Sequence, residues 1–198
     1  MRAKVILLLL WAATAHAADD DESGEAPNPQ VADEELGARI GASLNLAGIG
    51  PGGFYITGNW LYRLTSGLWF DARAGFSIGN SDSNCTIGVG PASCNSAVTS
   101  GFGVDILGGV RWFAPASGKL VPWLGGGTGF LYANFSGDHL SGFGLPFWVA
   151  GGVRARVSDA IAIGGEALFV FGPVRYESPI FGKAFANLHI MFGVDFAM

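Results

Sequence analysis

Charged side chains alternate with apolar ones along several stretches of this chain. Asp71 and Arg73, for example, are separated and flanked by Phe70, Ala72 and Ala74. Both signs of charge occur in this pattern, so the chemistry that these residues offer first is ion pairing. The titratable residues with this alternate spacing are Arg39, Arg63, Asp71, Arg73, Asp105, Arg111, Arg154, Arg156, Glu166, His189 and Asp195.

Catalysis and metal binding have weaker support in the sequence. His189 could act as a general base oriented by Glu166, but no serine is clearly placed beside them. His139 lies among polar residues of the kind that are common in loops. The run from residue 80 to 84 has oxygen ligands at alternate positions, as a calcium loop does, but it lacks the glycine and the closing glutamate of such a loop. We therefore expect no catalytic residues, no metal and no cofactor.

The first seventeen residues have the features of a secretory signal peptide. Arg2 and Lys4 precede a short apolar run, and Ala15-His16-Ala17 is a small-x-small cleavage site. That run is too short to span a bilayer as a helix, and no later stretch has eighteen consecutive apolar residues. The sequence predicts an exported chain without a transmembrane helix.

Two cysteines, Cys85 and Cys94, lie in a polar segment. An even pair in an exported protein predicts a disulfide, worth about 2–3 kcal/mol for so small a ring. Metal ligation is not expected, because no histidine or further cysteine accompanies the pair.

The composition suggests a chain that faces lipid. Hydrophobic residues make up 49% and charged residues only 14%, against roughly 25% charged in a typical soluble domain. Eight of the sixteen acidic residues fall between Asp19 and Glu35, so residues 18–36 are predicted to be a flexible acidic leader. The remainder is nearly neutral, which gives no reason to expect a nucleic-acid partner.

Alternation of apolar and polar residues predicts eight strands. It is clearest near the end of the sequence, where Leu188, Ile190 and Phe192 alternate with His189 and Met191. In the fifth strand, glycines leave the register ambiguous. The predicted strands are residues 37–47, 54–64, 68–78, 101–113, 119–135, 146–157, 160–171 and 184–198.

The lengths of strands and connections predict the architecture. Each strand has about eleven residues or more, as a bilayer crossing requires, and short connections alternate with longer ones, as in bacterial outer-membrane barrels. We expect residues 37–198 to form a closed eight-stranded antiparallel up-and-down transmembrane β-barrel in a Gram-negative outer membrane, with both termini periplasmic. The first and last strands must then pair, because hydrocarbon does not tolerate an open edge. A soluble periplasmic barrel is the alternative.

Aromatic residues near the predicted strand ends suggest two girdles at the membrane interfaces. Those near the periplasmic turns are Trp60, Tyr62, Trp69, Trp112 and Trp123. Those near the outer end are Phe54, Phe76, Phe102, Phe130, Phe147 and Phe171.

The opposite faces of the strands should fill the lumen, because eight strands enclose only enough space for side chains. Unpaired buried charges are costly, so the eleven titratable residues are predicted to form an ion-pair plug. A middle layer should contain Arg73, Asp105, Arg154, Glu166 and His189, with the other six nearer the periplasm. Inward glycines could instead leave a narrow polar path, which is the channel alternative.

Gly193, Phe196 and Met198 match the spacing of the outer-membrane sorting signal that the barrel assembly machinery reads, whereas Met191 stands where a polar residue is usual. With the strand pattern, residues 37–198 resemble the small eight-stranded barrels of the OmpA/OmpX-like superfamily. The resemblance implies assembly-machinery and outer-membrane-lipid contacts. It also implies a non-enzymatic structural or surface-contact role through external loops, whose partner the sequence does not specify. A narrow solute or ion channel is the alternative, and a lipid-modifying enzyme a third hypothesis.

Overall fold

The computed structural model describes residues 33–48, 50–81, 84–86, 93–95, 99–115, 119–136, 140–177 and 184–198. The predicted signal peptide, the predicted leader up to residue 32 and His139 lie outside these ranges. Within them, no helix is long and apolar enough to cross a membrane.

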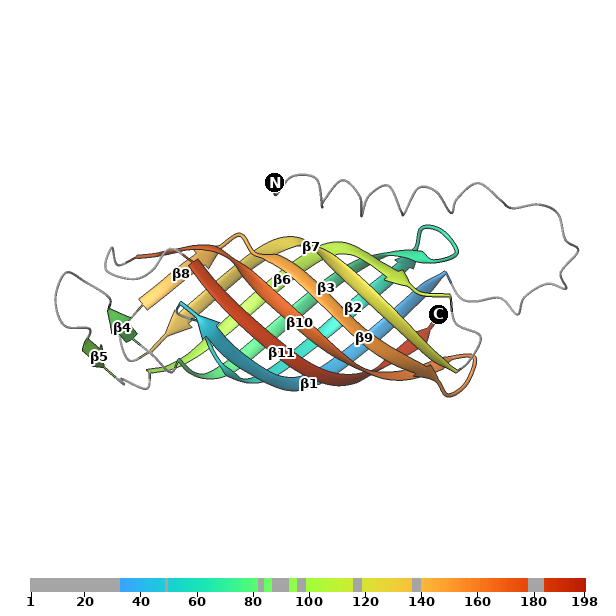
Figure 1. The fold of residues 1–198 in the computed structure, drawn as a ribbon, viewed down its shortest axis with the longest axis horizontal. Helices are drawn as coiled ribbons and strands as arrows, with labels where there is room; N and C mark the ends of the chain where they lie inside the picture. The colour runs from blue at the N-terminus through green and yellow to red at the C-terminus, as the bar shows by residue number, and fades with distance from the viewer. Residues whose placement is uncertain are drawn as a thin grey trace, which may run out of the picture. The chain divides into compact units, whose positions relative to one another are not determined.

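Nine strands form one antiparallel sheet that closes into a barrel (Figure 1). They follow the order β11-β1-β2-β3-β6-β7, then β8 and β9 together, then β10, which pairs with β11. A separate hairpin contains β4 and β5. The bounds are β1 Glu34–Ala47, β2 Gly53–Arg63, β3 Leu68–Ser81, β4 Asn84–Thr86, β5 Ser93–Asn95, β6 Thr99–Phe113, β7 Leu120–Phe135, β8 Leu140–Gly144, β9 Phe147–Arg156, β10 Ile161–Tyr176 and β11 Ala184–Ala197.

Strands β8 and β9 act as one wall strand interrupted at Pro146. Gly144 pairs with Leu131 and Phe147 with Thr128, so the register on β7 does not shift across the break. Pro146 accepts a hydrogen bond from the Gly129 amide at 3.0 Å but has no N–H to return one. The barrel thus has eight wall strands, as predicted. The sequence predicts no strand between residues 135 and 146, and this was wrong for residues 140–144, which form β8.

The first and last strands close the barrel, which confirms that prediction. The β1–β11 ladder runs from the pair Glu35–Ala197 to the pair Ala47–Ala186. Strand β1 begins at Glu34, three residues before the predicted start, and the Met198 amide donates to the Glu34 carbonyl at 3.0 Å. The last residues of the predicted leader therefore belong to the barrel wall.

Short turns at residues 64–67 and 157–160 lie at the end of the barrel where Glu34 pairs with Tyr62 and Met198 bonds Glu34. We call this the turn end and the opposite end the loop end. At the loop end, Gly48 in the β1–β2 connection and Gly53 at the start of β2 have φ of 72° and 110°, a conformation that favours glycine.

The outer surface is apolar. Ile106 is 62% exposed and Phe192 is 70% exposed, as expected of positions that face hydrocarbon. Near the turn end, the rings of Trp60 and Phe70 meet edge to face at 6.1 Å. A chain of ring contacts crosses β3, β6, β7 and β8 near the loop end, through Phe76, Phe102, Tyr132 and Phe143.

Candidate functional site

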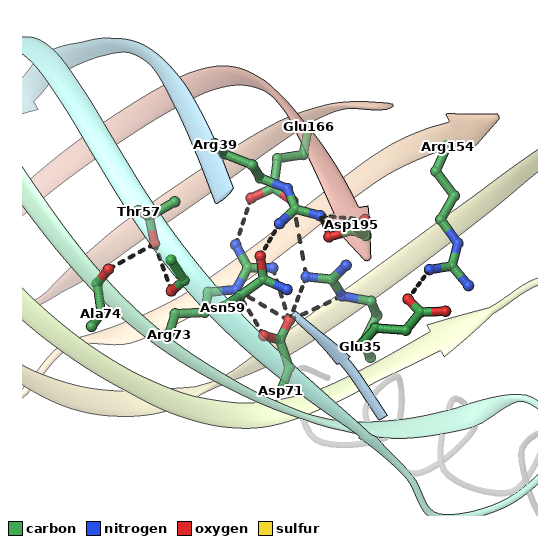
Figure 2. A network of polar contacts seen from close by, with 12 residues as sticks. Glu35, Arg39, Thr57, Asn59, Asp71, Arg73, Ala74, Arg154, Glu166 and Asp195 are labelled. Carbon is green, nitrogen blue, oxygen red and sulfur yellow. Dashed lines mark hydrogen bonds and ion pairs between the residues drawn. The ribbon is translucent and has the colours of Figure 1, made fainter. Parts of the chain in front are cut away.

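Six charged side chains from five strands meet in the lumen, and Figure 2 shows five of them with labels. All six are buried, because they occupy the inward positions of the strand alternation. They comprise three arginines and three carboxylates, so their formal charges cancel. We call this group the central lattice: Arg39 of β1, Asp71 and Arg73 of β3, Arg111 of β6, Glu166 of β10 and Asp195 of β11.

Glu166 is the junction of the central lattice. Its carboxylate accepts from Arg73 Nη1 at 2.5 Å and lies 3.0 Å from Arg39 Nε. Arg111 Nη2 lies 4.0 Å from the same carboxylate. Glu166 thereby links β10 to strands on the other side of the lumen.

Two further carboxylates complete the lattice. The two carboxylate oxygens of Asp195 accept hydrogen bonds of 2.7 and 2.9 Å from Arg39 Nη2. The side-chain oxygen of Asn59 accepts another from Arg39 Nη1. Asp71 accepts from Arg73 Nη2 at 2.9 Å and from Arg111 Nη2 at 2.8 Å. Every guanidinium thus has at least one carboxylate partner, which offsets the cost of burying it.

Aromatic rings cover the arginines from the side of the barrel that carries no lattice charge. The Arg111 guanidinium lies 3.9 Å from the centre of the Trp123 ring, and that of Arg73 lies 4.8 Å from the Trp148 ring. Such cation–π contacts are attractive. Strand β7 therefore supports the lattice through Trp123 although it contributes no charge.

The girdle prediction was wrong for two tryptophans. Trp69 and Trp123 are only 2% and 3% exposed and face the lumen, whereas Trp60 and Trp112 face outward. Trp69 shares the odd-numbered face of its strand with Asp71, so the alternation indicated its direction. Trp123 lies in the glycine-rich strand, where that signal was ambiguous.

A second ion-pair group lies nearer the turn end. Glu35 bonds Arg154 and lies 3.7 Å from Arg156. Glu35 is buried, and the leader assignment missed it. Arg63, 3.6 Å from Asp33, and Arg156 have side chains that are 26% and 35% exposed, so these two predicted interior residues are only partly buried.

The predicted middle layer does not form as one group. Arg73 and Glu166 join the central lattice, and Arg154 joins Glu35. Asp105 and His189 instead flank Tyr55, whose hydroxyl donates to Asp105 at 2.9 Å and whose ring lies 4.0 Å from that of His189. Strands in a barrel are tilted and staggered, so equal distance from a turn does not mean equal height.

His189 and Glu166 do not form a base and its orienting carboxylate. Glu166 is occupied by arginines, and within the described residues the buried Nδ1 of His189 has no hydrogen-bond partner. In the same part of the chain, no group of three or more histidine, cysteine, aspartate or glutamate residues is arranged to hold a metal ion.

The lumen beyond the central lattice, toward the loop end, is filled mainly by apolar side chains. These residues are at most 8% exposed and come from four strands; we call them the apolar cap: Leu107, Leu131, Phe135, Leu168, Val170, Tyr176 and Phe185. The described lumen therefore contains two different fillings, one ionic and one apolar.

The remaining predicted residues lie in the closing strand and the hairpin. Phe196 and Met198 are exposed on the outer face. A Cβ on Gly193 would lie 2.2 Å from the Ala38 carbonyl oxygen and 2.3 Å from Arg39 Cγ, so this glycine leaves room for the lattice whatever its part in sorting.

In the β4–β5 hairpin, Cys85 lies directly opposite Cys94. Opposed Cα atoms in antiparallel strands are about 4.5–5.5 Å apart, within the range that a disulfide spans. The disulfide itself stays a prediction.

No protein-family model matches the chain, and no curated protein sequence matches it. Solved structures do. Neisserial surface protein A superposes with a TM-score of 0.63 at 12% identity, over 84% of this chain and 97% of that one. The chain has the fold of a small transmembrane β-barrel. Two Pseudomonas aeruginosa proteins agree: OprG has a TM-score of 0.51 at 7% identity, over 83% of this chain and 96% of that one. The N-terminal barrel of OprF has a TM-score of 0.50 at 12% identity, over 84% and 98%.

Proposed function

We propose that this protein is a non-enzymatic barrel of a Gram-negative outer membrane, with a closed lumen and a structural or surface-contact role through the loops at its loop end. The observation that carries this proposal is the ionic bridge across the lumen, in which Glu166 of β10 pairs with Arg39 of β1 and Arg73 of β3. The apolar cap provides a second barrier on the loop side.

Both termini belong on the periplasmic side in this proposal. The longest connection, from the end of β3 at Ser81 to the start of β6 at Thr99, lies at the loop end, and long loops at one end are typical of bacterial outer-membrane barrels. The apolar outer face is the surface for outer-membrane lipid. Gly193, Phe196 and Met198 are the residues that we assign to recognition by the barrel assembly machinery.

Conductance across a planar bilayer tests the closed lumen. We expect the purified barrel to be silent under voltage, because in this proposal the two fillings together close the lumen to water. Steady unitary currents would instead establish the narrow-channel alternative. That alternative has some support, because Arg111 Nη1 is buried without a hydrogen-bond partner among the described residues and could bind water.

Two further experiments test location and the absence of enzyme activity. Fractionation followed by heat-modifiable gel migration should place the folded protein in the outer membrane, whereas extraction without detergent would indicate a soluble barrel. The non-enzymatic role would be contradicted if the protein changes the lipid profile of the membrane and if His189→Ala or His139→Ala abolishes that change.

A further inference from the structure

Two asparagines, Asn84 and Asn134, begin the acceptor sequence for N-linked glycans, which is Asn-x-Ser/Thr with any x except proline. The bacterial transferases that attach such glycans also require an acidic residue two positions before the asparagine. Asp82 stands at that position before Asn84, whereas Tyr132 precedes Asn134. The complete bacterial acceptor sequence is therefore present once in this chain, as Asp82-Ser83-Asn84-Cys85-Thr86.

The structure places Asn84 outside the barrel wall. Asn84 is the first residue of β4, which pairs with β5 and with none of the barrel strands that the structure describes. The hairpin is inserted between the end of β3 at Ser81 and the start of β6 at Thr99, and it extends beyond the loop end (Figure 1). A glycan is bulky and hydrophilic and belongs on a water-exposed surface. The hairpin can carry one without placing it against lipid.

Asn134 has the opposite setting, inside a wall strand. On β7 it pairs with Phe102 of β6 on one side and with Ser141 of β8 on the other. Its partly buried side chain donates to the Tyr132 hydroxyl at 3.5 Å. A glycan on Asn134 would be attached to the lipid-facing wall, beside the contacting rings of Phe102 and Tyr132. The two asparagines thus share the short acceptor sequence but differ in the acidic residue and in their place in the fold.

We propose that Asn84 carries an N-linked glycan, attached in the periplasm by an oligosaccharyltransferase of the bacterial type. The co-substrate is an oligosaccharide linked to a polyprenyl diphosphate. A bond forms between Asn84 Nδ2 and the anomeric carbon of the first sugar, and the bond from that carbon to the diphosphate oxygen breaks. Polyprenyl diphosphate leaves, and one amide proton passes to the transferase. The proposal goes beyond the structural role and depends, among the predictions above, on export of the chain.

The test is to produce the full chain in a Gram-negative host that has such a transferase, a lipid-linked oligosaccharide of known mass and a reference acceptor protein. Intact-protein mass spectrometry should show one added glycan on the wild type after removal of the signal peptide, and peptide mapping should place it on Asn84. Asn84→Gln, Thr86→Ala and Asp82→Ala should each abolish the addition, whereas Thr86→Ser should keep it because serine also fits the acceptor sequence. The matched control is Asn95→Gln, which changes the residue directly opposite Asn84 in the hairpin and should keep the glycan. Asn134→Gln should also keep it.

Several outcomes would overturn the proposal. An unmodified wild type beside a modified reference protein would show that Asn84 is no acceptor, and a glycan mapped to Asn134 would show that neither the acidic residue nor the hairpin decides the site. Unchanged modification of Asp82→Ala would remove the argument from the bacterial acceptor sequence. Loss of the glycan in Asn95→Gln or Thr86→Ser would show a general disturbance of the hairpin instead of a specific site. A chain that keeps its signal peptide would contradict export and this proposal with it, whereas a glycosylated chain that is extracted without detergent would contradict only the outer-membrane location.

Discussion

Replacing Glu166 with glutamine should destabilise the barrel strongly. The substitution keeps the size of the side chain but removes the carboxylate 3.0 Å from Arg39 Nε and 2.5 Å from Arg73 Nη1. Three buried arginines then share the charges of Asp71 and Asp195, which leaves one positive charge uncompensated. Breaking a buried ion pair from one side costs about 3–5 kcal/mol, so we expect a loss of that size in the free energy of unfolding.

Reversible urea unfolding in detergent, followed by tryptophan fluorescence, measures this loss. The matched control is Glu177→Gln, an exposed glutamate whose substitution should change stability by no more than about 0.5 kcal/mol. If Glu166→Gln changes the free energy of unfolding as little as this control does, the ion pairs of Glu166 do not stabilise the barrel as their geometry implies.

A second substitution should repair the first. Arg73→Gln together with Glu166→Gln leaves two complete pairs, Arg39 with Asp195 and Arg111 with Asp71. The double variant should therefore be more stable than the sum of the single losses predicts, by about 1–3 kcal/mol of coupling. Additive losses would refute the idea that charge balance, rather than each contact separately, stabilises the lumen. In planar bilayers Glu166→Gln should stay silent, because the apolar cap still closes the loop side.

Three other predictions concern packing and the hairpin. Trp123→Leu should cost about 2–3 kcal/mol in urea unfolding through lost packing and cation–π contact, and clearly more than Trp112→Leu on the outer face. Gly193→Ala should destabilise by about 1–3 kcal/mol, because its Cβ would clash with Arg39, whereas Gly108→Ala, with nothing within 4 Å of its Cβ, should be neutral by the same assay. Thiol titration of the unfolded, unreduced protein should find no free cysteine; two reactive thiols would disprove the disulfide.

Alternation was enough to predict the eight wall strands and their closure, because a strand between lipid and a packed lumen must sort its side chains onto two faces. The prediction failed where local composition hides this signal. Residues 140–144 contain two glycines and precede Pro146, which is typical of a loop. They form a strand because they pair with β7 on one side and β10 on the other. Glu35 was missed because its acidic surroundings resemble a solvated tail.

The grouping of charges was less predictable than their direction. Every lattice residue was expected to point inward, but which ones meet depends on the stagger between strands. Asp105 and Arg73 come from neighbouring strands and were expected in one layer, yet Arg73 turns to Asp71 and Glu166 while Asp105 bonds Tyr55. Which partner a charged side chain pairs with depends on how far side chains from all the strands extend across the lumen. The sequence of one strand does not show this.

The lattice contributes more to the specificity of the barrel than to its net stability. Buried ion pairs often do little better than apolar side chains of the same volume, so burial alone does not explain five charged strands. A strand that slips by one residue, however, turns its inward charges to the lipid, where each arginine costs about 2–4 kcal/mol at the bilayer midplane. The same slip leaves its former partners unpaired in the lumen. Strands β1, β3, β6, β10 and β11 all place charges in one neutral group. A register shift in any of them therefore has two costs: its own charges face lipid, and its former partners stay unpaired in the lumen. We infer that the central lattice fixes the register in which the barrel closes.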